Sequence, residues 1–355
     1  MTRSRLVVVA SFTVVSLGVA AALGALLLDP ARAAVGPLPA EGLALPAGTR
    51  FVMGVDLPRF VASPLYQKLA AKETAHRMEA LREFEERTGV NPERDVEQVL
   101  VAGSKTDKGN DEVVALFLGR FDRYKLGRAI ETEKKDVTWK DHHGTNVYLF
   151  SESELQGKGG SPRKGRHGSG AMAFLDDRSI VIGAQAAVEA VVANRAEGTA
   201  SLKSNAALTG LLEQVKPGST FWMVGDRTLL AHLPSSIPSP GGAAGSSIDL
   251  PSLKSLVVSG DLDPQVSLHL TGEAADEAAA TQLADVVRGL TALMALQAGQ
   301  RPQLKELASA IGVTTEATRV HVEARIPYAL IDSLVPAPPV VAEEGEAKAA
   351  PDPKQ

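Results

Sequence analysis

Cysteine is absent from the 355 residues of the chain. Disulfides, thiolate metal sites, iron–sulfur clusters, a thiol nucleophile and a lipid-modified N-terminal cysteine are therefore excluded. Aromatic residues are scarce, at 4% with 2 tryptophans and 4 tyrosines. Few side chains are thus available to stack on bases or sugar rings, and we expect a mainly aliphatic core.

An excess of positive charge is also lacking, because 37 Lys and Arg are set against 42 Asp and Glu, for a net charge of -5. Phosphate backbones require a broad positive surface, so nucleic acid is excluded as a partner. The contents of 44% hydrophobic and 22% charged residues are those of a globular chain.

Motifs of the common catalytic families are missing as well. The patterns G-x-S-x-G, G-x-x-x-x-G-K-[ST], G-x-G-x-x-G and H-E-x-x-H do not occur. Ser161 and Lys164 formally match S-x-x-K, but Pro162 opposes the helix which that spacing needs, and no K-T-G follows. We therefore predict no catalytic residue, no cofactor and no enzymatic activity.

The N-terminus carries the one long apolar run. Residues Leu6 to Leu28 have no charge and follow Arg3 and Arg5. As a helix the run would reach about 34 Å, enough to cross a hydrocarbon core of roughly 30 Å. The positive flank places the N-terminus in the cytoplasm and the remaining chain outside. The A-x-A pattern at residues 31–33 also suits signal peptidase, so residues 1–33 are either a membrane anchor or a cleaved signal peptide.

Both alternatives export the body. We expect it on the periplasmic side of a bacterial inner membrane, anchored there, or else cleaved and soluble in the periplasm or secreted. Residues 34–45, rich in Pro, Ala and Gly, are predicted to be a spacer. Residues 336–355, rich in Pro, Ala and Glu, are predicted to be a disordered tail, because they hold too little apolar surface to offset the entropy of ordering.

An internal duplication is indicated within the body. Residues 48–56 (GTRFVMGVD) align without gaps on residues 218–226 (GSTFWMVGD). We predict two tandem α+β repeats, residues 46–200 and 201–335, each a mainly antiparallel sheet with helices on one face, joined by a helix over 206–215.

Two kinds of periodicity support this fold class. Val266, Leu268 and Leu270 alternate with polar residues, which predicts a half-buried antiparallel strand. Apolar residues recur every three or four positions over 275–297, which predicts an amphipathic helix. A second helix is predicted over 66–88 and ends at Gly89.

Two groups of residues are candidate ligand sites. Imidazole and carboxylate lie together at Asp141, His142 and His143, a candidate metal site that a simple turn between strands also explains. A flexible, basic loop over 156–170 is a candidate contact for anionic lipid, peptidoglycan or an acidic protein, with a solvated loop as its alternative. The basic residues of that loop are Lys158, Arg163, Lys164, Arg166 and His167.

Asp56 and Asp226 occupy equivalent positions in the two repeats, each at the end of a predicted strand. They are either a general acid and base or, as we expect, the caps of two helices. His269 and His321 lie at polar positions of predicted strands, so we expect both to face outward.

Three segments carry a resemblance to known proteins: FVMGVDLPRFVASPLYQKL, FEERTGVNPERDVEQVLVAG and VVALFLGRF. Together they resemble a group of uncharacterised exported or membrane-anchored bacterial proteins with a duplicated α+β body, over residues 46–335. The resemblance implies the fold and the location. It transfers no activity and no active-site residue.

The leading functional hypothesis is a non-enzymatic binding or scaffold protein of the cell envelope, with an envelope protein or lipid as partner. The main alternative is a carrier of lipid or a small molecule, with an apolar pocket between sheet and helices. A third is an envelope hydrolase whose residues converge from separate segments.

Overall fold

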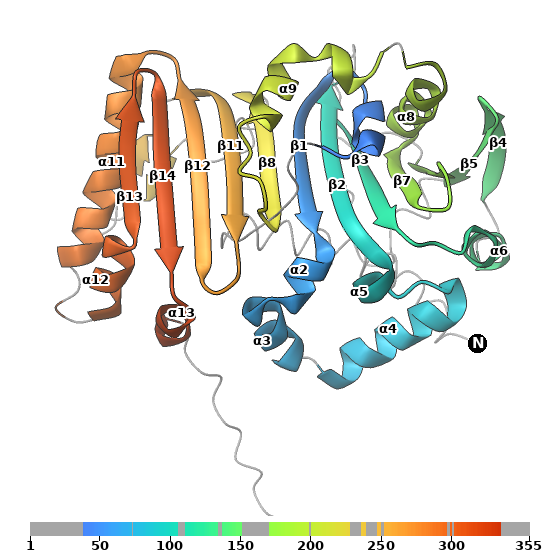
Figure 1. Ribbon diagram of the computed structural model, residues 1–355, viewed down its shortest axis with the longest axis horizontal. Helices are drawn as coiled ribbons and strands as arrows, with labels where there is room; N and C mark the ends of the chain where they lie inside the picture. The colour runs from blue at the N-terminus through green and yellow to red at the C-terminus, as the bar shows by residue number, and fades with distance from the viewer. Residues whose placement is uncertain are drawn as a thin grey trace, which may run out of the picture.

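The computed structural model describes residues 38–72, 74–105, 111–133, 137–150, 170–198, 200–227, 236–238, 247–249, 252–296, 299 and 302–334. The chain is an α+β protein built around one 12-stranded antiparallel sheet, with a separate two-stranded ribbon (Figure 1). The predicted fold class and the mainly antiparallel pairing are therefore confirmed.

The elements follow one another along the chain in short stretches. The strands of the large sheet are β1 (Thr49–Asp56), β2 (Val96–Lys105), β3 (Asp111–Gly119), β4 (Thr138–His142), β5 (Thr145–Phe150), β6 (Gly170–Phe174), β7 (Ser179–Ala184), β8 (Phe221–Asp226), β11 (Leu253–Asp261), β12 (Val266–Ala274), β13 (Ile311–Glu316) and β14 (Arg319–Ile326). The ribbon consists of β9 (Ser236–Pro238) and β10 (Ser247–Asp249). The helices are η1 (Ala40–Ala44), α2 (Leu57–Ala62), α3 (Pro64–Lys72), α4 (Thr74–Thr88), α5 (Pro92–Asp95), α6 (Arg123–Glu133), α8 (Gln185–Glu197), η2 (Leu202–Ser204), α9 (Ala206–Leu212), α11 (Glu277–Leu296), α12 (Pro302–Ser309) and α13 (Tyr328–Leu334).

The two halves of the chain share the sheet. Its strand order is β13-β14-β12-β11-β8-β1-β2-β3-β7-β6-β5-β4, so β8 and β1 meet near the centre. These two strands pair antiparallel, with Met53 opposite Met223 and Val52 opposite Val224. The halves therefore form one continuous hydrogen-bonded layer rather than two separately packed sheets.

Helices cover both faces of the sheet in the N-terminal half. Ala171 and Ala173 of β6 belong to the same core cluster as α8, whereas Met172 belongs to a second cluster with Ile130 of α6. Alternate residues of a strand point to opposite faces, so the two clusters lie on opposite sides of the sheet. The prediction of helices on one face only is wrong for this half. A strand that is buried on both faces has apolar residues at successive positions, so its sequence does not show which face a helix covers.

Helix α11 covers one face of the C-terminal half, beside β13 and β14 at the left of Figure 1. Its Ala280 and Ala284 are fully buried in a cluster with Val320 of β14. These small side chains let the helix approach the strands closely. The helix predicted over 275–297 is thus observed with slightly shorter bounds.

Residues 38–45 belong to the folded body, contrary to the predicted spacer. Leu45 is 1% exposed and Leu38 is 7% exposed in the main core cluster. The sequence around these two leucines is rich in Pro, Ala and Gly, and their burial depends on distant strands. Residues 1–37 and 335–355, with the predicted anchor or signal peptide and the tail, lie outside the described residues. Within the part of the chain that the structure describes, no helix is both long and apolar enough to cross a membrane.

Local signals explain where the helices begin and end. The segment predicted as one helix over 66–88 is observed as α3, ending at Lys72, and α4, beginning at Thr74. Gly89 follows α4 with a φ of 76°, a conformation that favours glycine and ends the helix as predicted.

Asp56 caps α2, since its Oδ1 accepts a hydrogen bond from the Arg59 amide at 3.0 Å. We expect Asp56→Ala to lower the free energy of unfolding by about 1 kcal/mol, because the Arg59 amide loses its acceptor at the start of the helix. Urea denaturation followed by circular dichroism measures the change. Asp56→Asn keeps an oxygen acceptor and should remain close to wild type; equal losses in both variants would contradict a capping role.

Candidate functional site

The candidate metal residues do not converge on one point. They lie in the β4–β5 hairpin, where Nε2 of His142 is 3.1 Å from the carbonyl oxygen of Glu189 and Nδ1 of His143 is 3.2 Å from Oε1 of Glu197. Asp141 instead accepts a hydrogen bond from the turn backbone at 3.3 Å. No group of three or more potential metal ligands occurs among the described residues. The turn between strands, the alternative explanation, is what the structure contains here.

The other candidates separate in the same way. Asp56 and Asp226 end adjacent antiparallel strands, and so lie at opposite ends of the ladder; Asp226 pairs with Arg50 at 3.2 Å. They cannot act together as acid and base. The basic loop with Lys158, Arg163, Lys164, Arg166 and His167 lies outside the described residues.

A row of polar side chains covers the face of β12, β14 and β13 that points away from α11. We name it the open polar face. Directly paired residues carry it: Thr271 faces His321, His269 faces Glu323, and Glu273 faces Arg319. The other members are Arg325 of β14 and Thr314 and Glu316 of β13. Val320 and Val322, which alternate with these residues, pack in the α11 cluster, so the two faces of these strands differ in polarity.

One chain of contacts on the open polar face runs through His269. Nζ of Lys216 lies 3.0 Å from Nε2 of His269, and Nδ1 of the same ring lies 3.3 Å from Oε1 of Glu323. Arg325 holds the other oxygen of Glu323 at 3.3 Å. A lysine ammonium donates only, so the neutral ring accepts at Nε2 and carries its proton at Nδ1 toward the carboxylate. Opposite charges thus fix the ring in one orientation.

A second series of side-chain contacts on the open polar face runs through His321. Its Nδ1 is 3.0 Å from Oγ1 of Thr271, and its Nε2 is 4.0 Å from Oε2 of Glu316.

Next to this pair of residues, Glu273 accepts a hydrogen bond from Oγ1 of Thr318 at 2.8 Å and pairs with Arg319 at 3.2 Å. The hydrogen bond from the Thr318 hydroxyl lowers the pKa of the Glu273 carboxyl below its usual range, and Arg319 lowers it further by a smaller amount. The Glu273 carboxyl therefore stays ionised at a lower pH than a free glutamate does.

The third hypothesis, a hydrolase, meets a specific obstacle on this face. Ser259, His269 and Glu323 follow one another across three paired strands, in the order of a serine, a base and an orienting acid. However, Ser259 is only 3% exposed. The Nε2 atom that would take its proton already faces the Lys216 ammonium. The arrangement supports a fixed charged surface better than an acyl-transfer site.

The contact between Thr318 and Glu273 predicts a pH dependence of stability. A carboxyl whose folded-state pKa is lowered stabilises the fold fully above the unfolded pKa of about 4.3, and this stabilisation is lost as the pH falls through the folded pKa. We expect Thr318→Ala to be less stable than wild type at pH 6, and the difference to narrow as the pH falls toward 3. Urea midpoints from pH 3 to 6 measure this difference. A difference that is the same at every pH would contradict the assignment.

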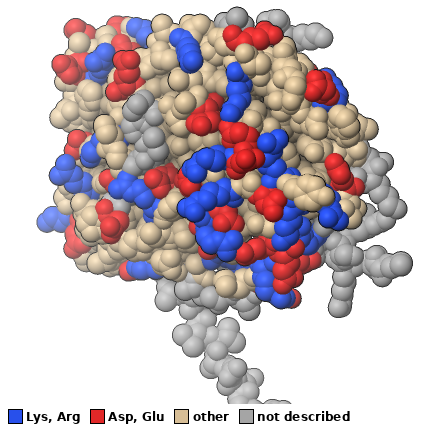
Figure 2. Space-filling model, turned by 45° about the vertical axis from the view of Figure 1, so that its right-hand side comes forward, with Lys and Arg blue, Asp and Glu red and all other residues tan. Residues whose placement is uncertain are grey.

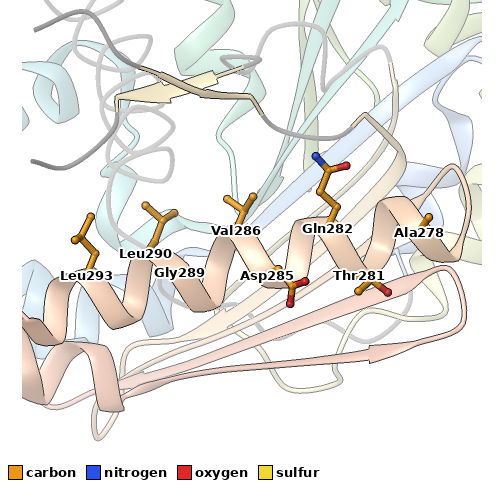
Figure 3. Close-up of a pocket in the computed structure, with 8 residues that line it drawn as sticks. All are labelled: Ala278, Thr281, Gln282, Asp285, Val286, Gly289, Leu290 and Leu293. Atoms are coloured by element: carbon orange, nitrogen blue, oxygen red, sulfur yellow. The ribbon is translucent and has the colours of Figure 1, made fainter. Parts of the chain in front are cut away.

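Two surface hollows are large enough to be candidate ligand pockets. The larger, of about 800 Å³, runs along α11 alone, as Figure 3 shows. Its lining residues are Ala278, Thr281, Gln282, Asp285, Val286, Gly289, Leu290 and Leu293. The smaller, of about 520 Å³, lies between α4 and α5 and includes Met78, Arg82 and Glu93. Because Ala280 and Ala284 are fully buried, the contact of α11 with the sheet is closed, and neither hollow lies between them.

Charges of both signs are interleaved on the N-terminal half, as Figure 2 shows with that side turned forward. Glu97 pairs with both Arg120, at 3.5 Å, and Arg178, at 2.5 Å. Arg94 lies 3.0 Å from Glu85. Such mutual neutralisation opposes the broad positive potential that a polyanion-binding surface needs.

The sequence marked His269 and His321 as outward-facing polar residues, and the structure places both on the open polar face. Lys216, Glu323 and Arg325 were missed. Strand register brings Glu323 to His269 and Arg325 to Glu323, and the connection between α9 and β8 brings Lys216 to the same ring. The alternation of His321, Glu323 and Arg325 along one strand was a signal that could have found two of the three.

Comparisons with known proteins add no relative. No family model matches the chain, and neither a curated protein nor a solved structure matches it.

Proposed function

We propose that the chain is a non-enzymatic binding or scaffold protein of the bacterial cell envelope. The observation that carries this proposal is the open polar face, where Lys216, His269, Glu323 and Arg325 hold one another in place on a broad sheet surface. Side chains that are ordered before binding lose less entropy on contact with a partner. Their mixed charges suit the polar surface of another protein.

The location belongs to the proposal as well. The uncharged run from Leu6 to Leu28 behind Arg3 and Arg5 supports export, with the body on the periplasmic side of the inner membrane. The proposal allows two states of the exported chain: it is attached to the membrane through residues 6–28, or it is cleaved after residue 33. Sequencing the N-terminus of the mature protein and washing its membranes with carbonate separate them. An intact chain found in the cytosol would contradict both.

We further propose that the body is a tandem duplication with the halves related by a two-fold axis. The order of strands outward from the centre is β1-β2-β3-β7-β6 on one side and β8-β11-β12-β14-β13 on the other. The gapless alignment makes Met53 and Met223 equivalent, and the same two residues face each other in the β1–β8 ladder. A two-fold axis must pass between equivalent residues that pair, so alignment and register support the same axis.

Photo-crosslinking in intact cells tests the binding function. A photoreactive amino acid replaces Thr271 on the open polar face, in the wild-type chain and in Glu323→Lys, and replaces the exposed Arg82 of α4 as a control. We expect one discrete adduct from position 271, about tenfold weaker in Glu323→Lys because a like charge then faces Lys216 and Arg325. No adduct from position 271, or equal adducts from position 82, would contradict the proposal.

A carrier of lipid or another apolar molecule is the second candidate. It is favoured by the hollow along α11, where Val286, Leu290 and Leu293 point to the same side (Figure 3). Native mass spectrometry of the purified chain tests it, since a carrier should retain co-purified mass that Leu290→Gln reduces. A bare mass for the wild type would leave the scaffold function as the better explanation.

A further inference from the structure

Strand β13 ends the sheet, and no described strand pairs with its outer side. Its sequence, IGVTTE, has four β-branched residues, no proline and one charge at its last position. The pairing with β14 runs from Ile311 to Glu316 without a bulge. Proteins usually protect such edges with charges, prolines or bulges. β4, at the opposite edge, carries Lys140, Asp141 and His142, whereas β13 has almost none of this protection.

The outward hydrogen-bonding groups of β13 can be identified. The Arg325 amide donates to the Ala310 carbonyl at 3.0 Å, so the backbone of residue 310 faces β14. Backbone groups alternate along a strand, which turns Ile311, Val313 and Thr315 toward the open side. These three residues are arranged symmetrically about Val313.

We propose that β13 pairs antiparallel with β13 of a second copy of this chain, about a two-fold axis at Val313. In this register Val313 faces Val313, and Ile311 faces Thr315, so every outward donor and acceptor of the strand finds a partner. A shift of the axis to Thr314 would place Ile311 opposite Ala317, which lies beyond the strand with a φ of 49°. Only the register at Val313 uses the whole edge.

Two observations favour a second copy of this chain over another occupant: the position of the one charged residue of the strand, and the similar pairing of β1 with β8 inside the chain. The one charged residue of the strand, Glu316, falls opposite Ala310 rather than opposite another carboxylate, so the copies meet without repulsion. The chain also joins its own halves in the same manner, through antiparallel pairing of β1 and β8 centred on Met53 and Met223. The inference stands apart from the proposed function, because β13 would pair through its edge and leave the open polar face accessible.

Single cysteines test this register, since the chain has no cysteine of its own. Paired residues of a hydrogen-bonded site have Cα atoms about 5.5 Å apart, within the range of a disulfide, whereas the two copies of Thr314 would be about 8 Å apart. Under mild oxidation of the purified full chain, we expect Val313→Cys to give about tenfold more disulfide-linked dimer than Thr314→Cys. Trp139→Cys, on the edge strand β4, should give none.

A mixing experiment keeps the proposal testable if a change at the half-buried Val313 disturbs the fold. Ile311→Cys and Thr315→Cys should each form no disulfide-linked dimer under oxidation, and a mixture of the two should form the crossed disulfide. Sedimentation equilibrium of the unmodified chain should show a dimer. A monomer at about 100 µM, a dimer that links through Thr314 rather than Val313, or a mixture that forms no crossed disulfide would each overturn the proposal.

Discussion

Trp222→Ala should lower the free energy of unfolding by about 3–5 kcal/mol, the largest loss that we expect from a single truncation in this chain. The indole lies on β8, beside the centre of the sheet, and is 1% exposed. Alanine would remove its contacts and leave a cavity that neighbouring strands on both sides cannot close. Because typical domains are stable by only 5–15 kcal/mol, the variant should melt far below the wild type in calorimetry.

The second tryptophan provides a matched control. Trp139 is 59% exposed on the edge strand β4, so Trp139→Ala should change the free energy of unfolding by less than about 0.5 kcal/mol. Equal losses from both variants would contradict the burial of Trp222. Trp222→Phe should cost less than alanine, because it keeps an aromatic ring in the site. Both substitutions remove the indole N–H, for which the described residues offer no acceptor.

A double-mutant cycle identifies what the indole touches. A Cβ added at Gly54 would lie 2.6 Å from Cε2 of Trp222, so Gly54→Ala forces the ring to move. The same substitution should cost less in the Trp222→Ala background, with a coupling of about 0.5–3 kcal/mol. If the losses of stability from the two substitutions simply add, the methyl group at position 54 does not clash with the Trp222 ring. The cycle also tests the β1–β8 junction, because the two residues face each other across it.

Individual helices and strands could be predicted from local signals. Alternation identified β12, three- and four-residue spacing identified α11, and Asp56 and Gly89 were recognised as a helix cap and a helix stop. The single sheet could not be predicted, because the two halves of the chain would show the same alternation whether β1 and β8 paired or packed apart. The burial of Leu38 and Leu45 was missed for the same reason, since it depends on the core that they meet.

The candidate site was less predictable than the fold. His269 and His321 were recognised as outward-facing, but their partners come from other segments, and Lys216 comes from the connection between α9 and β8. A cross-strand contact depends on register, which a single sequence does not encode locally. The motif that did attract attention, Asp141 to His143, brings two imidazole rings within 4.6 Å of each other, but their nitrogens face Glu189 and Glu197 of α8 rather than a shared point.

Gly183→Ala should destabilise the chain by about 3 kcal/mol, through overpacking rather than a cavity. A Cβ on Gly183 would lie 2.4 Å from the carbonyl oxygen of Val113 and 2.7 Å from Cα of Val114. Both atoms are backbone of the neighbouring strand β3, which cannot rotate away as a side chain can. Relief therefore requires the β3–β7 pairing to separate, and hydrogen exchange of β7 amides should rise together with the loss of stability.

The control for this prediction is the same substitution where space is free. Nothing lies within 4 Å of a Cβ at Gly289, in the middle of α11, so Gly289→Ala should stabilise the chain by about 0.5–1 kcal/mol through helix propensity. The two variants add the same methyl group and should shift the urea midpoint in opposite directions. A gain or no change for Gly183→Ala would mean that β3 and β7 lie further apart than the register of Val114 with Gly183 requires.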